Sequence, residues 1–511
     1  MHNNSRTAKS ILNIKVAFLF YILNLALQFI SRKIFLDYLG SEVLGLNTTS
    51  QNLLGFLNLA ELGIGSAIAY SLYKPLSTNN TQDINNIVSV QGWMYHQIAW
   101  FIIIASCVLM LFFPYIFAKT SLPIWYAYGS FSALLIGSLL SYFFNYRQIV
   151  LSADQKEYKI TYTTQSIKLS KIICQILAIR FVKDGYIYWL IFEVIGAIIS
   201  SIALNNIIKK EYPWLTPKIK NGKILKKQYT TIITKTKQIF FHKISNFVLT
   251  QTSPLIIYGY ASLSLVAIYG NYLLIITGIS MLISALSNSL GAGVGNLVAE
   301  NDKKKIKTVF WEITSLRMWI GTIVCFSFYH LADSFITIWV GEQYILSHTT
   351  LIILSVTTFI DLTRTNDIFL SAYGLFKDVW APIAEAILNL LFSIILGYYY
   401  GLAGILAGAL ISILIIVCCW KPYFLFRDGF KEPIKEYIIL YTKKLLILTI
   451  PSIIIYIVLH NIPLPTDNFF HWTLYGSICF LIYGIVCWFI FYLFDQDFRT
   501  GFKRLYSHIL K

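Results

Sequence analysis

The sequence is poor in charged residues. Only 13% of its 511 residues are Asp, Glu, Lys or Arg, whereas 57% are hydrophobic. The mean hydropathy is +0.64, which is far more apolar than an ordinary soluble domain. A water-soluble globular protein is therefore excluded, and an integral membrane protein is expected.

The sequence also lacks the short motifs of several enzyme classes. It contains no HExxH, GxSxG or P-loop pattern. The lysine-rich segment 209–237 is nearly free of acids and has no aspartate pair for a metal. We therefore expect no catalytic residue, no cofactor and no ATP-driven transport, and we interpret the chain as a protein other than an enzyme.

Cysteine is scarce and unpatterned. The seven cysteines form no CxxC pair and no cluster with histidine, and each lies in an apolar run. We interpret them as small buried hydrophobic residues, and we expect neither a metal site nor a disulfide. Residues 1–13 are polar and basic, and the apolar run that follows lacks a cleavage site, so it is expected to be a retained first helix.

Long apolar runs recur from end to end of the chain. A helix of about 20 mostly apolar residues crosses about 30 Å of hydrocarbon, and about fourteen such segments can be marked. The sequence therefore predicts an all-α integral membrane protein with about 14 transmembrane helices. The predicted helices are 14–34, 44–70, 93–113, 124–146, 160–180, 186–208, 238–257, 264–290, 309–331, 349–372, 380–398, 402–424, 438–459 and 469–494.

The distribution of lysine and arginine predicts the orientation. An even number of helices places both termini on one side, and positively charged loops stay in the cytoplasm. With the N-terminus inside, most of the 41 Lys and Arg residues fall in cytoplasmic segments. The net charge of +17 is then explained by cations that face anionic membrane lipids, and no nucleic-acid partner is needed.

The chain contains two weakly similar halves. Three short matches occur in register, and each joins a predicted helix of the first half to the helix six positions later. They predict two six-helix lobes arranged as parallel internal repeats, followed by two C-terminal helices. The matching segments are 60–67 with 288–295, 151–153 with 370–372, and 196–200 with 408–412.

These repeats suggest four regions. An N-lobe of six helices covers 1–208, and a lysine-rich cytoplasmic linker covers 209–237. A C-lobe of six helices covers 238–424, and two more helices with a basic tail cover 425–511. In transporters built from such repeats, the substrate site lies between the lobes, which move to expose it to each side in turn.

The N-terminal third resembles the polysaccharide repeat-unit flippases of the O-antigen and capsule type. These belong to the multidrug/oligosaccharidyl-lipid/polysaccharide exporter superfamily, which includes the MATE transporters. The resemblance is strongest over about the first 160 residues. It rests on Arg32–Gly40 (RKIFLDYLG), Gly45, Ala60–Gly65 (AELGIG), Ser71–Leu76 (SLYKPL) and Ala153–Lys156 (ADQK).

The resemblance implies a V-shaped pair of lobes in the bacterial inner membrane. It implies transport of undecaprenyl-pyrophosphate-linked oligosaccharide from the cytoplasmic to the periplasmic leaflet, for the assembly of O-antigen lipopolysaccharide, capsule or exopolysaccharide. The expected partners are this polyprenyl-linked glycan, the membrane lipids, a polysaccharide polymerase and a chain-length regulator. The coupling ion is expected to be H⁺ or Na⁺.

Cations within the predicted helices are the candidates for binding a pyrophosphate headgroup. Charges in the middle of a membrane helix usually face a bundle interior or an aqueous cavity. Cations near helix ends can instead extend to the interface. Arg364 has Asp361 and Asp367 three residues to either side on the same helical stripe, so it can instead form an internal ion pair. The candidates are Lys168, Lys171, Arg317, Arg364, Arg32, Arg147 and Lys243.

Acids in or near the predicted helices are candidates for ion coupling. A carboxyl group in a low-dielectric cavity can hold a proton at neutral pH. The alternative is that each acid balances a cation, and for Glu61, beside Gly63 and Gly65, a helix-packing role competes. The candidates are Glu61, Asp361, Asp367, Glu193 and Glu385.

Two other functions stay open at this stage. One is a cation-coupled multidrug or small-molecule exporter of the same superfamily. The other is a membrane polymerase or transferase of the same pathway, which the absence of a catalytic loop disfavours. The excess of cations in the helices favours an anionic cargo and therefore the flippase.

Overall fold

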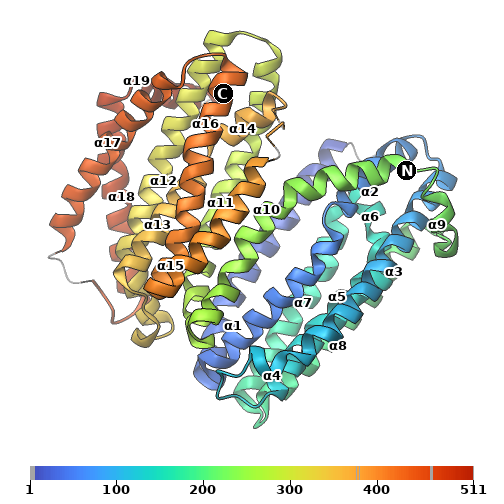
Figure 1. The fold of residues 1–511 in the computed structure, drawn as a ribbon. Coiled ribbons are helices and arrows are strands. Elements are labelled where there is room, and N and C mark those ends of the chain that lie inside the picture. The colour runs from blue at the N-terminus through green and yellow to red at the C-terminus, as the bar shows by residue number, and fades with distance from the viewer. Residues whose placement is uncertain (1–5, 376, 379, 461–463, 510–511) are drawn as a thin grey trace. The chain divides into compact units, whose positions relative to one another are not determined.

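The structure is a computed structural model that describes residues 6–375, 377–378, 380–460 and 464–509 (Figure 1). All secondary structure in these ranges is helical. The chain forms two compact units, Met1–Ala267 and Ile268–Lys511.

The prediction of an all-α membrane protein is confirmed. All fourteen predicted spans fall on a helix or on consecutive helices. In the described residues, eight helices are long and apolar enough to cross a membrane, and nine if the bent pair Trp125–Phe143 and Asn145–Ala153 is one span. Two of the eight, Leu12–Glu61 and Trp380–Phe430, contain 50 and 51 residues. At 1.5 Å per residue each would be about 75 Å long, so each is long enough for two crossings of about 30 Å.

The first unit is built around α1, which packs on α5, α7 and α10. Helix α8 packs on α5 and α7, and α3 packs on α2 and α5. The elements of this unit are α1 (Arg6–Leu57), η1 (Asn58–Glu61), α2 (Ile64–Ser77), α3 (Thr81–Leu111), α4 (Phe113–Ile116), α5 (Trp125–Phe143), η2 (Asn145–Gln148), α6 (Ile149–Ala153), α7 (Glu157–Phe181), α8 (Gly185–Glu211), η3 (Ile219–Asn221), α9 (Gly222–Leu225) and α10 (Thr230–Tyr260).

A glycine breaks the helix beside Glu61. Gly63 has a φ of +91°, a conformation that favours glycine because it has no Cβ. A Cβ at this position would lie 2.8 Å from the Thr236 carbonyl oxygen of α10. The break therefore lets α10 approach the α1–α2 junction closely and fixes the Glu61 backbone at this contact.

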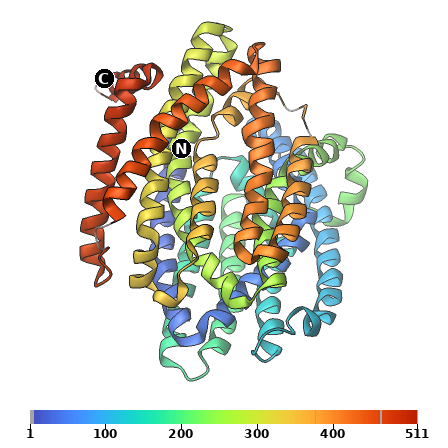
Figure 2. The same cartoon turned by 60° about the vertical axis from the view of Figure 1, so that its left-hand side comes forward.

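The second unit is a bundle around α12, which packs on α13, α17, α18 and α19. Figures 1 and 2 show α17 and α18 side by side, with α19 at one end of the pair. The elements are α11 (Leu263–Ala299), whose first turn belongs to the first unit, α12 (Lys303–Trp339), η4 (Glu342–Tyr344), α13 (His348–Leu362), α14 (Thr365–Ala372), α15 (Trp380–Ile413), η5 (Leu414–Trp420), α16 (Lys421–Phe424), η6 (Leu425–Phe430), α17 (Ile434–His460), α18 (Phe469–Phe494) and α19 (Gln496–Ile509).

Helix α15 contains a sharp kink at Gly401, which has a φ of +58°. After the kink the chain packs back on the first half of the helix. A Cβ at Gly404 would lie 1.9 Å from the Leu396 carbonyl oxygen, and Ser393 Oγ donates a hydrogen bond of 2.8 Å to the Ile405 carbonyl oxygen. The kink thus separates the predicted helices 380–398 and 402–424.

The two units divide the chain at a different place from the sequence repeats. The repeats place the start of the second lobe at residue 238, whereas the units meet at residues 267 and 268. Helix α10 packs on α1 and α2, and this places it with the first unit. The division into two repeated six-helix lobes stays a prediction.

Candidate functional site

In the first unit, two of the predicted cations lie on α7, and one of them is paired. The Lys171 ammonium lies 2.7 Å from Glu193 Oε1 on α8. Gln175 Nε2 donates a hydrogen bond of 3.0 Å to the other oxygen of the same carboxylate. Both oxygens of Glu193 are therefore occupied, and Lys171 and Glu193 form a structural link between α7 and α8.

Lys168 lies one turn before Lys171 and is different. Its side chain is exposed, and within the described residues its ammonium makes no hydrogen bond or ion pair. Residues three apart share one face of a helix, so Lys168 lies next to the Lys171–Glu193 pair. A cation on a membrane helix without a counter-ion is costly. Lys168 is therefore the candidate best suited to receive an anion from outside the protein.

The first unit contains three more of the predicted cations: Arg32, Arg147 and Lys243. The Arg32 guanidinium donates a hydrogen bond of 2.9 Å to the Ala267 carbonyl oxygen. Arg147 lies in η2, with its guanidinium carbon 5.9 Å from the centroid of the neighbouring Tyr146 ring, and its buried Nε has no hydrogen-bond partner in the described structure. Lys243 belongs to α10, but its side chain lies outside the described residues.

Glu61 belongs to a cluster of tyrosine side chains. The Tyr95 hydroxyl of α3 donates a hydrogen bond of 2.8 Å to Glu61 Oε1. The Tyr142 ring of α5 contacts the Tyr95 ring edge to face, and its hydroxyl donates a 3.1 Å hydrogen bond to Asn58 Oδ1. Glu61 thus lies in a polar cluster at the junction of α1, α3 and α5, where its carboxylate accepts a hydrogen bond from one tyrosine. No local signal in the sequence predicts this cluster, because Tyr95 and Tyr142 are distant from Glu61 along the chain.

In the second unit, the prediction that Arg364 shares one helical stripe with two aspartates is partly wrong. We expected Asp361, Arg364 and Asp367 to share one face of a continuous helix. Arg364 does lie 3.1 Å from Asp361, but it stands at the break between α13 and α14. Because the break turns the chain, Asp367 pairs instead with Lys421, at 2.8 Å.

Arg317 stabilises this same break. Its Nε donates a hydrogen bond of 2.9 Å to the Leu362 carbonyl oxygen, at the C-terminal end of α13. Its Nη1 lies 3.4 Å from the Arg364 carbonyl oxygen. A helix end leaves carbonyl groups without partners, and a cation there satisfies them. Arg317 therefore has a structural role in addition to any contact with a substrate.

Glu385 and Asn389 form a buried polar pair on α15. They are 4% and 0% exposed and lie four residues apart, on one face of the helix. Glu385 Oε1 lies 4.0 Å from Arg364 and has no hydrogen-bond partner in the described structure. Neither polar atom of the Asn389 side chain has one. The spacing of Glu385 and Asn389 is visible in the sequence, so Asn389 could have been recognised with Glu385.

A buried charge cluster around Lys444, inside α17, was not predicted from the sequence. The Lys444 ammonium, in a side chain that is only 4% exposed, lies 2.6 Å from Asp495 and 2.8 Å from Asp497. It also donates a 2.8 Å hydrogen bond to Ser315 Oγ. Lys444 could be recognised in the sequence as a charge within the predicted helix 438–459. Its pairing with Asp495 and Asp497 could not be predicted, because these acids lie about 50 residues further along the chain.

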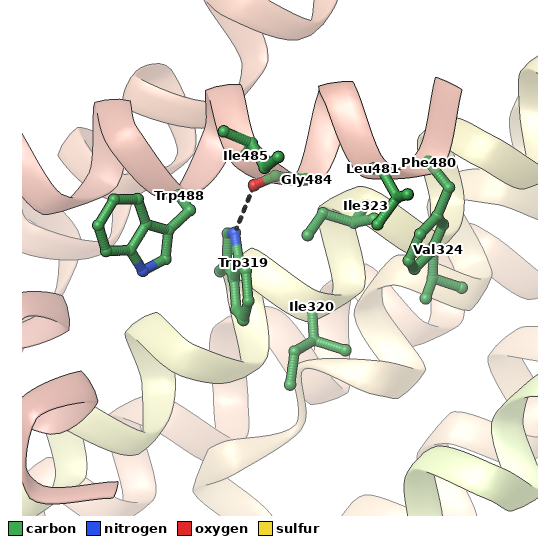
Figure 3. A pocket seen from close by; sticks show the side chains of 9 residues that line it. All are labelled: Trp319, Ile320, Ile323, Val324, Phe480, Leu481, Gly484, Ile485 and Trp488. Atoms are coloured by element: carbon green, nitrogen blue, oxygen red, sulfur yellow. Dashed lines mark hydrogen bonds between the residues drawn. The ribbon is translucent and has the colours of Figure 1, made fainter. Parts of the chain in front are cut away.

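An apolar groove lies between α12 and α18 (Figure 3). It has a volume of about 320 Å³, and Trp319 Nε1 donates a hydrogen bond of 3.3 Å across it to the Gly484 carbonyl oxygen. None of the predicted site residues lines it. The lining residues are Trp319, Ile320, Ile323, Val324, Phe480, Leu481, Gly484, Ile485 and Trp488.

The comparisons with known proteins rest on structure alone. No protein-family model and no curated protein sequence matches the chain. The chain is similar to the lipid II flippase MurJ in its inward closed conformation, with a TM-score of 0.66 and 18% identity, over 94% of this chain and 99% of that one. It is also similar to an inward-facing multidrug resistance MATE transporter of the MOP superfamily, with a TM-score of 0.61 and 12% identity, over 83% of this chain and 99% of that one.

These likenesses extend over almost the whole length of both solved proteins, of which one is named a flippase and the other a transporter. Their low identities make the likeness one of fold. The chain is thus a multi-pass membrane protein with the fold of these two proteins.

Proposed function

We propose that the protein is a flippase for undecaprenyl-pyrophosphate-linked oligosaccharide. In this proposal it carries repeat units from the cytoplasmic to the periplasmic leaflet of the bacterial inner membrane, for O-antigen, capsule or exopolysaccharide assembly. The fold likeness to a flippase named for lipid II supports a lipid-linked cargo. The sequence resemblance of the first 160 residues supports the polysaccharide class.

The observation that carries the proposal is that Lys168 is exposed and makes no ion pair within the described residues. A pyrophosphate that leaves water needs charge-assisted hydrogen bonds to offset the loss of hydration. Lys168 offers such a donor on a membrane helix and makes no ion pair within the described residues. The neighbouring Lys171 adds positive potential, although Glu193 balances most of its charge.

Coupling to an ion gradient is assigned in this proposal to Glu61 and Glu385. Glu61 accepts a hydrogen bond from Tyr95 at a helix break, where a small backbone change can alter its surroundings. Glu385 is buried, and one of its oxygens has no hydrogen-bond partner in the described structure. Asp361, Asp367 and Glu193 are weaker candidates, because each lies against a cation.

The second candidate function is a cation-coupled exporter of small molecules. The buried polar atoms of Glu385 and Asn389 favour it, because an acid and an amide without partners suit an ion of positive charge. The flippase is preferred because Lys168 suits an anionic cargo. The two functions differ in the charge of what is moved, and this difference can be measured.

The decisive experiment is a transport assay in vesicles. Purified protein is reconstituted with undecaprenyl-pyrophosphate carrying a labelled glycan, and the fraction that reaches the opposite leaflet is measured with an impermeant probe. We expect movement with the wild-type protein and at least a tenfold slower rate with Lys168→Gln. Lys183→Gln, which changes an exposed lysine in the α7–α8 turn, is the matched control and should keep the rate.

Three outcomes would contradict the flippase. The first is transport of a cationic dye without movement of the labelled lipid, which would favour the exporter. The second is an unchanged rate with Lys168→Gln at equal protein abundance. The third is hydrolysis of the glycan or of a nucleotide by the purified protein, which would favour an enzyme.

The orientation is tested separately. We propose that both termini and the 209–237 segment face the cytoplasm, as the lysine bias predicts. Single cysteines placed in this segment of a cysteine-free variant should react with an impermeant maleimide only after the membrane is opened. Labelling of intact spheroplasts from outside would overturn this orientation.

A further inference from the structure

A second cavity, which the proposed transport does not use, lies at the end of the second unit where α12 and α17 begin and α18 meets α19. Its volume is about 360 Å³. Four lysines line it, together with the Trp311 side chain and three acids. The lysines are Lys304, Lys307, Lys443 and Lys444.

The acids of this cavity are already paired. Lys307 lies 2.6 Å from Glu436 and 2.6 Å from Glu432, and Lys444 lies between Asp495 and Asp497. Lys304 and Lys443 are exposed and make no ion pair within the described ranges. The cavity therefore offers two lysines, Lys304 and Lys443, that contact no carboxylate in the described structure.

The Trp311 indole provides an independent sign of a missing acceptor. Trp311 is 3% exposed, and its Nε1 has no hydrogen-bond partner in the described structure. Buried N–H groups in proteins nearly always have an acceptor. The Lys444 ammonium lies 5.5 Å from the centre of the ring, so one cation of the cavity lies beside the indole. An anion in the cavity would supply the acceptor.

An apolar groove with a volume of about 440 Å³ continues from this cavity along α17 and α18. Lys443 and Phe494 line both, and the groove extends from Ile439 past Leu446 to Pro451. Twelve residues of helix rise about 18 Å, and one leaflet of hydrocarbon is about 15 Å thick. The groove thus has the length of a lipid acyl chain, with a lysine at its polar end.

We propose that the cavity and the groove together bind one anionic glycerophospholipid. Its phosphate lies among the side chains of Lys304, Lys443 and Trp311, and one acyl chain lies in the groove of Ile439, Leu446 and Pro451. Lys304 and Lys443, which have no carboxylate partner in the described structure, favour an anionic headgroup over a zwitterionic one. With the orientation that the lysine bias predicts, the lipid belongs to the cytoplasmic leaflet. The site requires only that α17 and α18 lie in a membrane, and it does not depend on the cargo.

The test is lipid retention by the purified full-length protein, measured by native mass spectrometry. The probes are dioleoyl phosphatidylglycerol, which is anionic, and dioleoyl phosphatidylcholine, which is zwitterionic with the same chains. We expect the wild-type protein to retain phosphatidylglycerol at least tenfold better. The double variant Lys304→Gln/Lys443→Gln should bind both lipids equally.

Matched variants separate the site from general surface charge. Lys303→Gln/Lys435→Gln removes two exposed lysines that do not line the cavity, and it should keep the preference for phosphatidylglycerol. Trp311→Phe keeps the ring but removes the N–H, and it should weaken phosphatidylglycerol binding severalfold. Leu446→Trp fills the groove and should weaken the binding of both lipids.

Three results would overturn the proposal. They are equal retention of the two lipids by the wild-type protein, an unchanged preference in Lys304→Gln/Lys443→Gln, and displacement of bound phosphatidylglycerol by one equivalent of undecaprenyl pyrophosphate. The last result would assign the groove to the cargo. If vesicle transport fails while phosphatidylglycerol binding behaves as expected, the flippase proposal alone is lost.

Discussion

The Lys171 ammonium lies 2.7 Å from the Glu193 carboxylate, whereas Lys168, one turn earlier on the same helix, has no ion pair in the described structure. The two lysines looked equivalent in the sequence, because both lie in the middle of the same predicted helix. In the structure they differ, because only Lys171 has a carboxylate partner in the described residues. Lys171 links α7 to α8, and Lys168 is the better candidate for binding an anion.

This difference predicts opposite effects on stability. Lys171→Gln leaves the Glu193 carboxylate without its cation, and we expect a loss of about 1–3 kcal/mol. Lys168→Gln breaks no ion pair within the described residues, and it should change stability by about 0.5 kcal/mol or less. Unfolding by sodium dodecyl sulfate in mixed micelles measures both. The double variant Lys171→Gln/Glu193→Gln should recover part of the loss, and equal effects of the two single changes would contradict the distinction.

Glu61 is expected to couple transport to a proton gradient. Glu61→Gln keeps the side-chain shape and an acceptor for the Tyr95 hydroxyl but cannot release a proton. We therefore expect an imposed proton gradient to accelerate transport by the wild-type protein in the vesicle assay, but not transport by Glu61→Gln. Glu61→Asp should still respond to the gradient. An equal response of Glu61→Gln and the wild-type protein would leave only a packing role for this residue.

Much of the fold could be predicted from the sequence because each membrane helix carries its own signal. About 20 apolar residues define a helix whatever surrounds it, and all fourteen predicted spans fall on helical segments. Two long helices are broken at glycines with positive φ, α1 at Gly40 and α15 at Gly401. Both glycines lie in the gaps between predicted spans. The boundary between compact units was not predicted, because it depends on the packing of α10 against α1 and α2.

The candidate sites were predicted less well, because the partner of a buried charge is set by packing. Arg364 and Asp361 are close in the chain, and their pairing was expected. Asp367 pairs with Lys421, and Lys444 with Asp495, over separations of about 50 residues that no periodicity reveals. A charge within a predicted helix could therefore be found, but its role as a binding group or as half of an ion pair could not be assigned.

The turn before α7 should respond to alkaline pH. Lys156 lies 2.6 Å from Asp154 and 2.7 Å from Glu211. Burial alone would lower the pKa of Lys156, but the hydrogen bonds and charges of the two carboxylates outweigh it and raise the pKa above the usual value of 10.5. A raised lysine pKa stabilises the folded state at pH values below the unfolded pKa, and this stabilisation is lost as the pH rises through the folded pKa.

We therefore expect Lys156→Gln to be less stable than the wild-type protein from pH 7 to pH 9, and the difference should shrink above about pH 10.5. Thermal unfolding in detergent at a series of pH values measures this. Lys209→Gln, which changes an exposed lysine at the end of α8, is the control and should show a small difference that is constant with pH. A difference for Lys156→Gln that does not depend on pH would show that its charge is not what stabilises the turn.

The Lys444 cluster is expected to hold α19 against the bundle. Asp495 is 4% exposed, and besides its contact with Lys444 it accepts a 2.9 Å hydrogen bond from the Phe498 backbone N–H in the first turn of α19. Lys444→Met removes the cation and leaves a buried carboxylate uncompensated, which costs about 3–5 kcal/mol in comparable cases. Lys444→Met/Asp495→Asn keeps an acceptor for the Phe498 N–H and removes the unpaired charge, so most of the stability should return. Protease cleavage between α18 and α19 should therefore be fast in the single variant and slow in the double variant, and equal cleavage of the two would show that the ion pair does not hold this helix.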